Sequence, residues 1–379
     1  MNRLIVALAL LTGFSLLAVE ADAPQRIRVA DHGKGFVFAA TEFGVDEKRF
    51  VPWGFNYLGE FEHLAEDDWE TPIGWARIEK DFKEMRKLGA NVVRWHLQFE
   101  TFMKAADQPN AEQLVRLKNL LKLARENSLY LDLTGLNCFR LKRIPVWYDA
   151  LSEAERWKSQ AKFWEAIAET CAKDPIVFCY DLMNEPVIGE PGKDEHPWLG
   201  GELGGFCFVQ RICNKPEKRD ANEIAEAWVK QMVDAIRAHD KETLVTVGVI
   251  PWALVWPGAK PVFYSPAAAK QLDFVSIHVY PETGKLEKEL AGLATYDIGK
   301  PIVIEEFFPM KCTLAELDKF VNAAATSKKG CVVGWVAHYF GHTTEEHRAG
   351  AKPGGKITAE FFEYWTKMGK NYAGPGSDK

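Results

Sequence analysis

Short apolar runs alternate with amphipathic stretches along most of the chain. Eight of these runs are typical of strands buried on both faces, and they cover residues 50–56, 91–97, 129–134, 176–183, 243–249, 274–279, 301–305 and 331–337. Helical periodicity is clearest between them, at residues 75–88, 111–127, 152–172, 221–239, 314–327 and 358–368. The stretches between the fifth and sixth runs and between the sixth and seventh predict only short helices.

This alternation predicts parallel strands with covering helices. Eight rounds favour closure into a (β/α)8 TIM barrel over an open doubly wound sheet. A short N-terminal β segment is predicted at residues 27–41, before the first round. A long loop rich in Gly and Pro follows strand four, at residues 187–220. Since active sites of this fold lie at the C-terminal ends of the strands, we expect this loop to form a wall of a cleft.

The first residues have the pattern of a secretory signal peptide. Asn2 and Arg3 precede an apolar run at residues 4–18, and small residues follow at Ala21 and Ala23. The run is too short to span a hydrocarbon core of about 30 Å. We therefore predict a signal peptide at residues 1–21, a single catalytic domain at residues 22–379 and a secreted or periplasmic location. Stable membrane insertion is not expected, and a retained N-terminal anchor is the alternative.

Composition narrows the choice of partners. The net charge is -6 and the pI about 5.9, with no basic stripe, so nucleic acid is not an expected partner. Seven cysteines cannot all pair, although Cys207 and Cys213 are close enough in sequence to form a disulfide. No cofactor and no metal are predicted, and a monomer is expected. A metal-dependent hydrolase would need the one close histidine set, which is His338, His342 and His347.

Two glutamates end predicted strands. Glu185 follows the fourth strand in the run Asn184-Glu185-Pro186, and Glu306 follows Glu305 at the end of the seventh. The carboxyl ends of barrel strands converge on one face of the molecule. A facing pair of carboxyl groups cleaves a glycosidic bond when one protonates the leaving oxygen and the other attacks the anomeric carbon. The pair therefore indicates a glycoside hydrolase.

With these residues the sequence resembles glycoside hydrolase family 5, in the clan of (β/α)8 retaining glycosidases. Asn184-Glu185-Pro186 matches the Asn-Glu-Pro that ends strand four in the family, and Glu306 followed by Phe307 matches its strand seven. The resemblance implies that Glu185 is the acid/base and Glu306 the nucleophile. Phe308 stands where many members have Gly, which leaves Glu305 as an alternative nucleophile.

Residues on neighbouring strands extend the resemblance. Arg94 matches the arginine that bonds the nucleophile and lowers its pKa. His278 and Tyr280 match a strand-six pair, in which Tyr280 donates to the nucleophile and His278 contacts the substrate. Trp335 matches the ring that forms the floor under the sugar next to the scissile bond. Asn184 is expected to bond a sugar hydroxyl through its amide.

One departure bears on the substrate. Family members often carry His at the end of strand three, where this chain has no His. Asn137 or His96 is expected to take over that contact. The runs 305–307 and 278–281 are most similar to β-mannanase-like members, and Trp252 is expected to line a subsite. We therefore expect a β-linked carbohydrate substrate of the mannan type. A β-1,4-glucan is the alternative, and a non-catalytic barrel that only binds polysaccharide is another.

Overall fold

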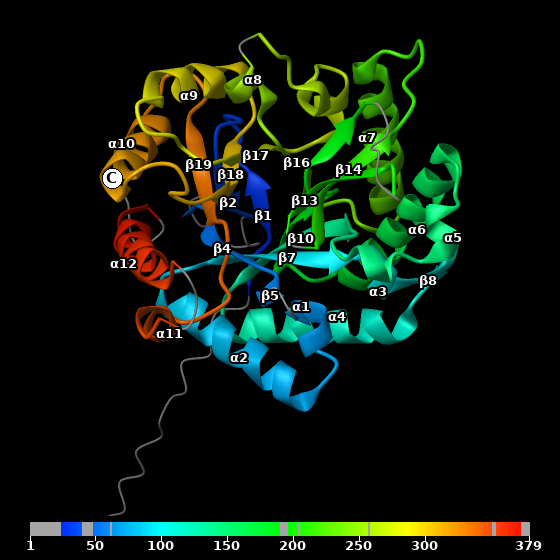
Figure 1. The fold of residues 1–379 in the computed structure, drawn as a ribbon, viewed down its shortest axis with the longest axis horizontal. Helices are drawn as coiled ribbons and strands as arrows, with labels where there is room; N and C mark the ends of the chain where they lie inside the picture. The colour runs from blue at the N-terminus through cyan, green and yellow to red at the C-terminus, as the bar shows by residue number, and fades with distance from the viewer. Residues whose placement is uncertain are drawn as a thin grey trace, which may run out of the picture.

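Parallel strands form the centre of the computed structural model, which describes residues 24–372 apart from 40–47, 61–62, 190–195, 204, 257 and 351–353. Their order is β15-β11-β10-β7-β4-β19-β18-β17-β16. The two ends of this order, β15 (Leu244–Thr246) and β16 (Gly248–Val249), are consecutive segments of one strand, so the sheet closes on itself (Figure 1). The other strands are β4 (Trp53–Tyr57), β7 (Val92–Gln98), β10 (Tyr130–Asn137), β11 (Val177–Asp181), β17 (Val275–Val279), β18 (Ile302–Phe307) and β19 (Val332–Ala337). The predicted (β/α)8 barrel is confirmed.

Helices surround the barrel between successive strands (Figure 1). The long ones are α2 (Pro72–Lys87), α4 (Ala111–Glu126), α6 (Glu153–Cys171), α7 (Ala221–His239), α10 (Leu314–Ala325) and α12 (Gly355–Tyr372). The two weakly patterned rounds contain α8 (Trp252–Val255) with two 3-10 helices (Val262–Tyr264 and Ala268–Gln271), and α9 (Leu286–Leu293) with a third (Ala294–Tyr296). The short helices are α1 (Ala65–Asp68), α3 (Phe99–Phe102), α5 (Val146–Asp149), α11 (Thr344–Arg348) and a 3-10 turn (Leu141–Arg143). The six predicted helices are confirmed.

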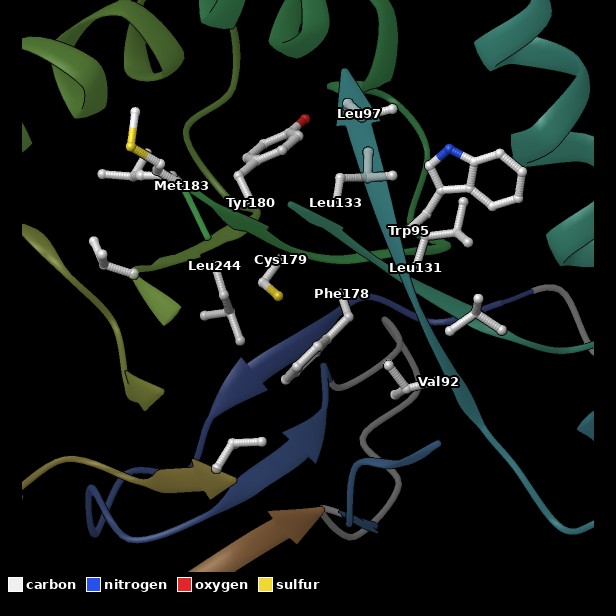
Figure 2. Packing of buried hydrophobic residues seen from close by; sticks show 14 of the residues in the cluster. Val92, Trp95, Leu97, Leu131, Leu133, Phe178, Cys179, Tyr180, Met183 and Leu244 are labelled. Atoms are coloured by element: carbon white, nitrogen blue, oxygen red, sulfur yellow. The ribbon is translucent and has the colours of Figure 1, made fainter. Parts of the chain in front are cut away.

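A small antiparallel sheet covers the N-terminal end of the barrel. It consists of β1 (Ile27–Val29), β2 (Phe36–Phe38) and β3 (Arg49–Phe50). Phe36 packs edge-on against Phe178 of β11 at 5.2 Å and against Phe274, just before β17, at 5.3 Å. Figure 2 shows Phe178 beside this sheet. The predicted N-terminal β segment is confirmed where it is described, and it leaves only the C-terminal end of the barrel open.

Side chains on the strands alternate between the helices and the barrel interior, as barrel geometry requires. On β7, Trp95 lies against Trp69 in the outer layer, with ring centroids 5.6 Å apart, and Figure 2 shows it pointing toward the helices. The residues that alternate with this outer set are buried and mainly polar, and they are Arg94, His96, Asp132, Thr134, Cys179 and Asp181. The interior is therefore polar toward the open end.

The segment after β11 contains a second small sheet. It is formed by β12 (Pro186–Ile188), β13 (Leu199–Leu203) and β14 (Phe206–Cys213) in the order β12-β14-β13. Gln210 donates to the backbone oxygen of Leu136 at 2.7 Å, which fastens the sheet to the end of β10. The expected loop is in the predicted place, but it has its own strands. Shorter strand pairs lie elsewhere: β5 (Gly59–Glu60) with β6 (His63–Leu64), and β8 (Met103–Ala105) with β9 (Gln108–Pro109).

The possible disulfide between Cys207 and Cys213 is excluded by this sheet. Both residues belong to β14, six positions apart along an extended strand. At about 3.3 Å per residue they are separated by roughly 20 Å, whereas a disulfide needs Cα atoms within about 7 Å. The predicted signal peptide lies outside the described residues. Within the described part of the chain, no helix is both long and apolar enough to cross a membrane.

Candidate active site

Glu185 and Glu306 face each other at the C-terminal opening of the barrel, with His278 between them. The Nδ1 atom of His278 lies 2.9 Å from Glu185 Oε1 and 3.5 Å from Glu306 Oε1. A carboxylate oxygen of each glutamate and this ring lie within 4.8 Å of one another. Carboxyl groups about 5 to 5.5 Å apart are typical of retaining glycosidases, whereas inverting enzymes separate them by about 6.5 to 9.5 Å. The geometry therefore fits retention.

The backbone turns sharply at Glu185, four residues beyond the end of β11. Its φ of 49° lies in the left-handed region, which is uncommon for a residue with a side chain. The amide of Glu185 donates to the backbone oxygen of Gly248 at 2.8 Å, which ties the turn to the next strand. Pro186 follows and begins β12. This turn directs the Glu185 carboxylate toward His278 instead of along the outer face.

Glu306 is surrounded by hydrogen-bond donors. Tyr280 donates its hydroxyl hydrogen to Oε2 at 2.6 Å, and Arg94 donates to Oε1 at 3.1 Å. Burial by itself would raise the pKa of Glu306, but the nearby imidazoles of His278 and His338 and the charge of Arg94 outweigh it. The pKa of Glu306 is consequently held well below its usual range, so the group is a carboxylate at neutral pH.

Glu305 lies deeper in the barrel and has a different environment. Its side chain is fully buried, with one oxygen 3.5 Å from Arg94 Nε. Burial raises its pKa well above the usual range, and the nearby charges of Asp132 and Asp181 raise it further. A protonated, solvent-inaccessible carboxyl group is unsuited to attack a sugar. The geometry therefore favours Glu306 over Glu305 as the nucleophile.

Arg94 connects the carboxylates to Asn184 and to two residues that the sequence did not single out. Its Nη2 atom lies 2.6 Å from Asp181 Oδ2 and donates to Asn184 Oδ1 at 3.1 Å, while Nη1 donates to Asn56 Oδ1 at 2.9 Å. Asp181 also accepts a hydrogen bond from the amide of Gly248 at 2.7 Å. Asn56 and Asp181 were not predicted, although both are polar residues within otherwise apolar strands. That interruption is the signal that could have identified them.

Gly248 is placed where several of these groups meet. A Cβ atom at this position would lie 2.9 Å from Arg94 Nη2, from Glu305 Oε2 and from His278 Nε2. Real side chains do not tolerate such contacts with a rigid buried network. The glycine therefore allows the guanidinium group and the carboxylates to approach the strand.

The remaining polar candidates are used mainly to build the site. The Asn184 nitrogen donates to the backbone oxygen of Phe208 in β14 at 2.9 Å, so this amide joins Arg94 to the small sheet. Asn137 donates to the backbone oxygens of Leu97 and Thr134 and is fully buried. It fixes strand ends and, among the described residues, has no hydrogen bond to either catalytic glutamate.

Asn137 and His96 were the two candidates to replace the missing histidine of strand three. Of these two residues, His96 lies in the network around Arg94. Its Nε2 atom is 2.9 Å from Asn56 Oδ1, the same oxygen that Arg94 contacts. Burial, followed by the charge of Arg94, holds the pKa of His96 well below its usual range. His96 is therefore neutral at neutral pH and supports Asn56.

One expected substrate contact is wrong. Trp335 is 1% exposed and packs against Phe307 at 5.2 Å and Phe320 of α10 at 6.2 Å, so it faces the helices and cannot form the floor under a sugar. The alternation of side chains along β19 is the reason, since the residue that reaches the opening is His338, just beyond the strand. The side chain of His278 is 1% exposed and lies against both carboxylates, so it orients them, and its contact with a substrate stays a prediction.

Trp252 lies beside the catalytic pocket. Its ring stacks on that of Trp256 with centroids 4.8 Å apart, and both rings line a cavity of about 390 Å³. A neighbouring cavity of about 290 Å³ contains Glu185, His278 and Tyr280. Ile250 lines both cavities. The tryptophan pair therefore forms an aromatic surface next to the carboxylates on the Glu185 side.

The three histidines of the close set in the sequence lie in different surroundings. His347 is buried against Phe362, and His342 contacts His347, whereas His338 turns to Tyr280. These three rings do not converge. Among the described residues, two sets place ligand atoms within 4.8 Å of one another, namely Glu185, His278 and Glu306, and Asp132, Cys179 and Glu305. Arg94 supplies the positive charge that both sets face.

A (β/α)8 barrel with two facing glutamates beyond β11 and at the end of β18 defines the class of retaining glycoside hydrolases. Residues 56–341 match the cellulase family, which is glycosyl hydrolase family 5, and the chain belongs to this family. The expected family is therefore confirmed, and the chain is a β-glycoside hydrolase with the retaining mechanism of that family. No curated protein matches the chain.

Solved structures share the fold at low sequence identity. The exo-β-1,4-mannosidase Op5Man5 from an Opitutaceae bacterium is 16% identical with a TM-score of 0.62, and the match covers 91% of this chain but only 62% of that one. The endo-1,4-β-mannanase from Rhizomucor miehei is 15% identical, covers 90% and 99% of the two chains, and has a TM-score of 0.58. The catalytic domain of Thermobifida fusca endoglucanase Cel5A is 14% identical, covers 91% and 97%, and has a TM-score of 0.54.

Proposed function

We propose that Glu306 is the nucleophile and Glu185 the acid/base in the hydrolysis of β-mannan-type polysaccharides or oligosaccharides. The observation that carries these roles is the unequal environment of the two carboxylates. The Glu306 carboxylate accepts hydrogen bonds from Tyr280 and Arg94, whereas the Glu185 carboxylate has a single hydrogen-bond partner among the described residues, which is His278. Donors stabilise the charged form that a nucleophile needs. The acid/base must exchange a proton and is left less constrained.

The reaction then follows in two displacements. Glu306 attacks the anomeric carbon while Glu185 gives its proton to the glycosidic oxygen, which leaves with the aglycone. Glu185, now a carboxylate, takes a proton from water, and the water oxygen displaces Glu306 from the anomeric carbon. Arg94 and Tyr280 hold the orientation of Glu306 through both steps. Two inversions return the original anomeric configuration.

The substrate class has weaker but consistent support. The two solved mannan-active enzymes named above share the fold over 91% and 90% of this chain. The departure at strand three, where buried Asn137 and His96 replace an expected histidine, also argues against the usual glucan site. A β-1,4-glucan remains the second candidate because the endoglucanase shares the fold over 91% of this chain.

We propose a secreted or periplasmic monomer, with residues 1–21 as the signal peptide and residues 22–379 as one catalytic domain. The sheet β12-β14-β13 is proposed as a cleft wall, because Asn184 binds it to the catalytic centre. A wall that blocks one end of the cleft limits cleavage to chain ends. Mapping the N-terminus of the exported protein tests the leader, since retention of residue 1 would exclude cleavage.

A substrate panel tests the function directly. Manno- and gluco-oligosaccharides of equal length are incubated with the enzyme, product lengths are recorded, and the anomeric proton of the first product is followed by NMR. We expect faster hydrolysis of the manno-series with retention of configuration. Faster hydrolysis of the gluco-series would overturn the substrate assignment, and initial inversion would overturn the mechanism. Binding without hydrolysis would favour a non-catalytic barrel.

A further inference from the structure

His338 reaches the catalytic centre from just beyond β19. Its backbone amide donates to the oxygen of Phe307 at 3.0 Å, which fixes the residue to the end of β18. Its Nδ1 atom lies 2.8 Å from the hydroxyl of Tyr280 and 3.4 Å from Glu306 Oε2. The imidazole also meets the Tyr280 ring edge-on, at 5.5 Å and 77°. These contacts place the ring of His338 beside the nucleophile.

The hydrogen bonds around Tyr280 have a defined direction. A phenol has one hydrogen, and the ionised Glu306 carboxylate can only accept. The Tyr280 hydrogen therefore points to Glu306 along the 2.6 Å contact. The remaining contact of the hydroxyl, at 2.8 Å, must then be donated by Nδ1 of His338. In the neutral ring this places the hydrogen on Nδ1 and leaves the lone pair on Nε2.

His338 is also partly exposed, just beyond the C-terminal end of β19. Its side chain is 32% exposed, compared with 10% for Glu306 and 1% for His278. Among the hydrogen bonds recorded for the described residues, none involves Nε2 of His338. An acceptor next to the nucleophile is suited to a sugar hydroxyl, which is both a donor and an acceptor.

We propose that His338 has two functions in the reaction proposed above: Nδ1 positions Tyr280 on the nucleophile, and Nε2 accepts a hydroxyl of the sugar bound next to the scissile bond. The inference rests on the proposed glycosidase function. It assigns a polar, hydrogen-bonding edge to the position where an aromatic floor was expected. His338 thus contributes both to the alignment of Glu306 and to the choice of sugar.

Two amide substitutions separate these functions. The His338→Asn amide reaches the Nδ1 position but not the Nε2 position, whereas the His338→Gln amide reaches the Nε2 position only. We expect His338→Asn to keep kcat within about threefold and to raise KM by roughly 2- to 10-fold, the range for one neutral hydrogen bond. We expect His338→Gln to lower kcat with a smaller change in KM. Equal changes in both variants, or none, would overturn the proposal.

A double-mutant cycle with Tyr280→Phe tests the connection to the nucleophile. If Nδ1 acts through Tyr280, His338→Gln has little further effect on kcat once the hydroxyl is gone, so the two changes are not additive. Additive losses would show that His338 acts independently of Tyr280. Thermal unfolding of each variant shows whether it is folded. The ratios of kcat and KM between variant and wild type are measured on whichever sugar the wild type hydrolyses. Failure of the mannan assignment is thus distinguishable from failure of this inference.

The tautomer gives a readout that needs no activity. Nitrogen chemical shifts of the His338 ring, assigned by comparison with His338→Asn, distinguish a hydrogen on Nδ1 from one on Nε2. We expect the Nδ1–H form in the wild type and a mixture of both forms in Tyr280→Phe, where the partner is lost. A hydrogen on Nε2, or on both nitrogens at the pH of maximal activity, would overturn the proposed acceptor role.

Discussion

Glu305 and Glu306 are consecutive residues of one strand, yet both turn to the barrel interior. Along β18 the partner of Ile304 on β17 is Ile277, but the partner of Glu306 is His278, so Glu305 is an extra residue in the ladder. A bulge of this kind re-aims side chains near active sites. It places Glu306 at the opening and Glu305 beneath it, beside Arg94.

This arrangement predicts opposite outcomes for two matched substitutions. Glu306→Gln removes the charged nucleophile and should lower kcat by at least about 10³-fold. Glu305→Gln replaces a buried group that burial already keeps protonated, so activity should stay within about tenfold of the wild type. Steady-state kinetics on an aryl glycoside measure both. If Glu305→Gln abolished activity while Glu306→Gln retained it, the two roles would have to be exchanged.

The role of Glu185 predicts a dependence on the leaving group. Glu185→Ala removes the proton donor, so hydrolysis of oligosaccharides, whose leaving alcohol needs a proton, should fall by about 10²- to 10⁴-fold. A dinitrophenyl glycoside has a leaving group that departs as an anion, so formation of the glycosyl-enzyme should be much less affected. Hydrolysis of the glycosyl-enzyme should become slow, so a burst of phenolate should appear in stopped-flow traces. An equal loss on both substrates would remove Glu185 from the acid/base role.

Gly248 predicts that one added methyl group would disturb the network of catalytic side chains. Gly248→Ala would place Cβ 2.9 Å from Arg94, Glu305 and His278, and the network must shift to accommodate it. Since misplacement of catalytic groups by about 1 Å costs on the order of 10²-fold, we expect a comparable loss of kcat. Gly189→Ala is the control, because an added Cβ meets nothing within 4 Å there. Similar kinetics for both variants would show that the site relaxes around the methyl group.

The fold was largely predictable because its signal is repeated. Eight apolar runs separated by helical periodicity identify the barrel even if the bounds of single elements are inaccurate. The terminal acids of runs four and seven identify the pair because Glu185 and Glu306 end buried strands. The residues found only in the structure, such as Asn56 and Asp181, are polar positions that alternate with apolar ones inside a strand. The sequence shows this pattern, but it does not show which strands lie opposite each other in the barrel.

The positions of Trp335 and His338 depended on geometry that sequence does not specify. Whether a residue near the end of β19 faces the sugar or the helices changes with every step along the strand. Trp335 pairs with Ile304 on β18 and Trp53 on β4, and the bulge after Ile304 shifts the register beyond it. The match of residue type to the family predicted Trp335 as the floor under the sugar. The strand register instead places His338 at that position. β12 and β13 were missed because they have three and five residues, and β14 because it lies within a segment rich in Gly and Pro that predicts a loop.

Glu100 predicts how stability depends on pH. Both of its carboxylate oxygens are buried without a hydrogen-bond partner among the described residues, and burial raises the pKa to about 8 from a reference value of 4.5. The folded chain therefore keeps this proton up to about pH 8, whereas the unfolded chain releases it near 4.5. Stability from this group is complete below pH 4.5 and is lost as the pH rises toward 8, at about 1.4 kcal/mol per pH unit.

Glu100→Gln should remove this contribution because the amide has no proton to lose. Urea unfolding at pH 5.5 and pH 7.5 should show a smaller fall in the free energy of unfolding for the variant than for the wild type. A residual fall is expected from Asp132, whose pKa burial raises to about 7. Glu126→Gln is the matched control, since that side chain is 57% exposed and should leave the slope unchanged. Identical slopes for wild type and Glu100→Gln would mean that Glu100 releases its proton at the same pH in both states.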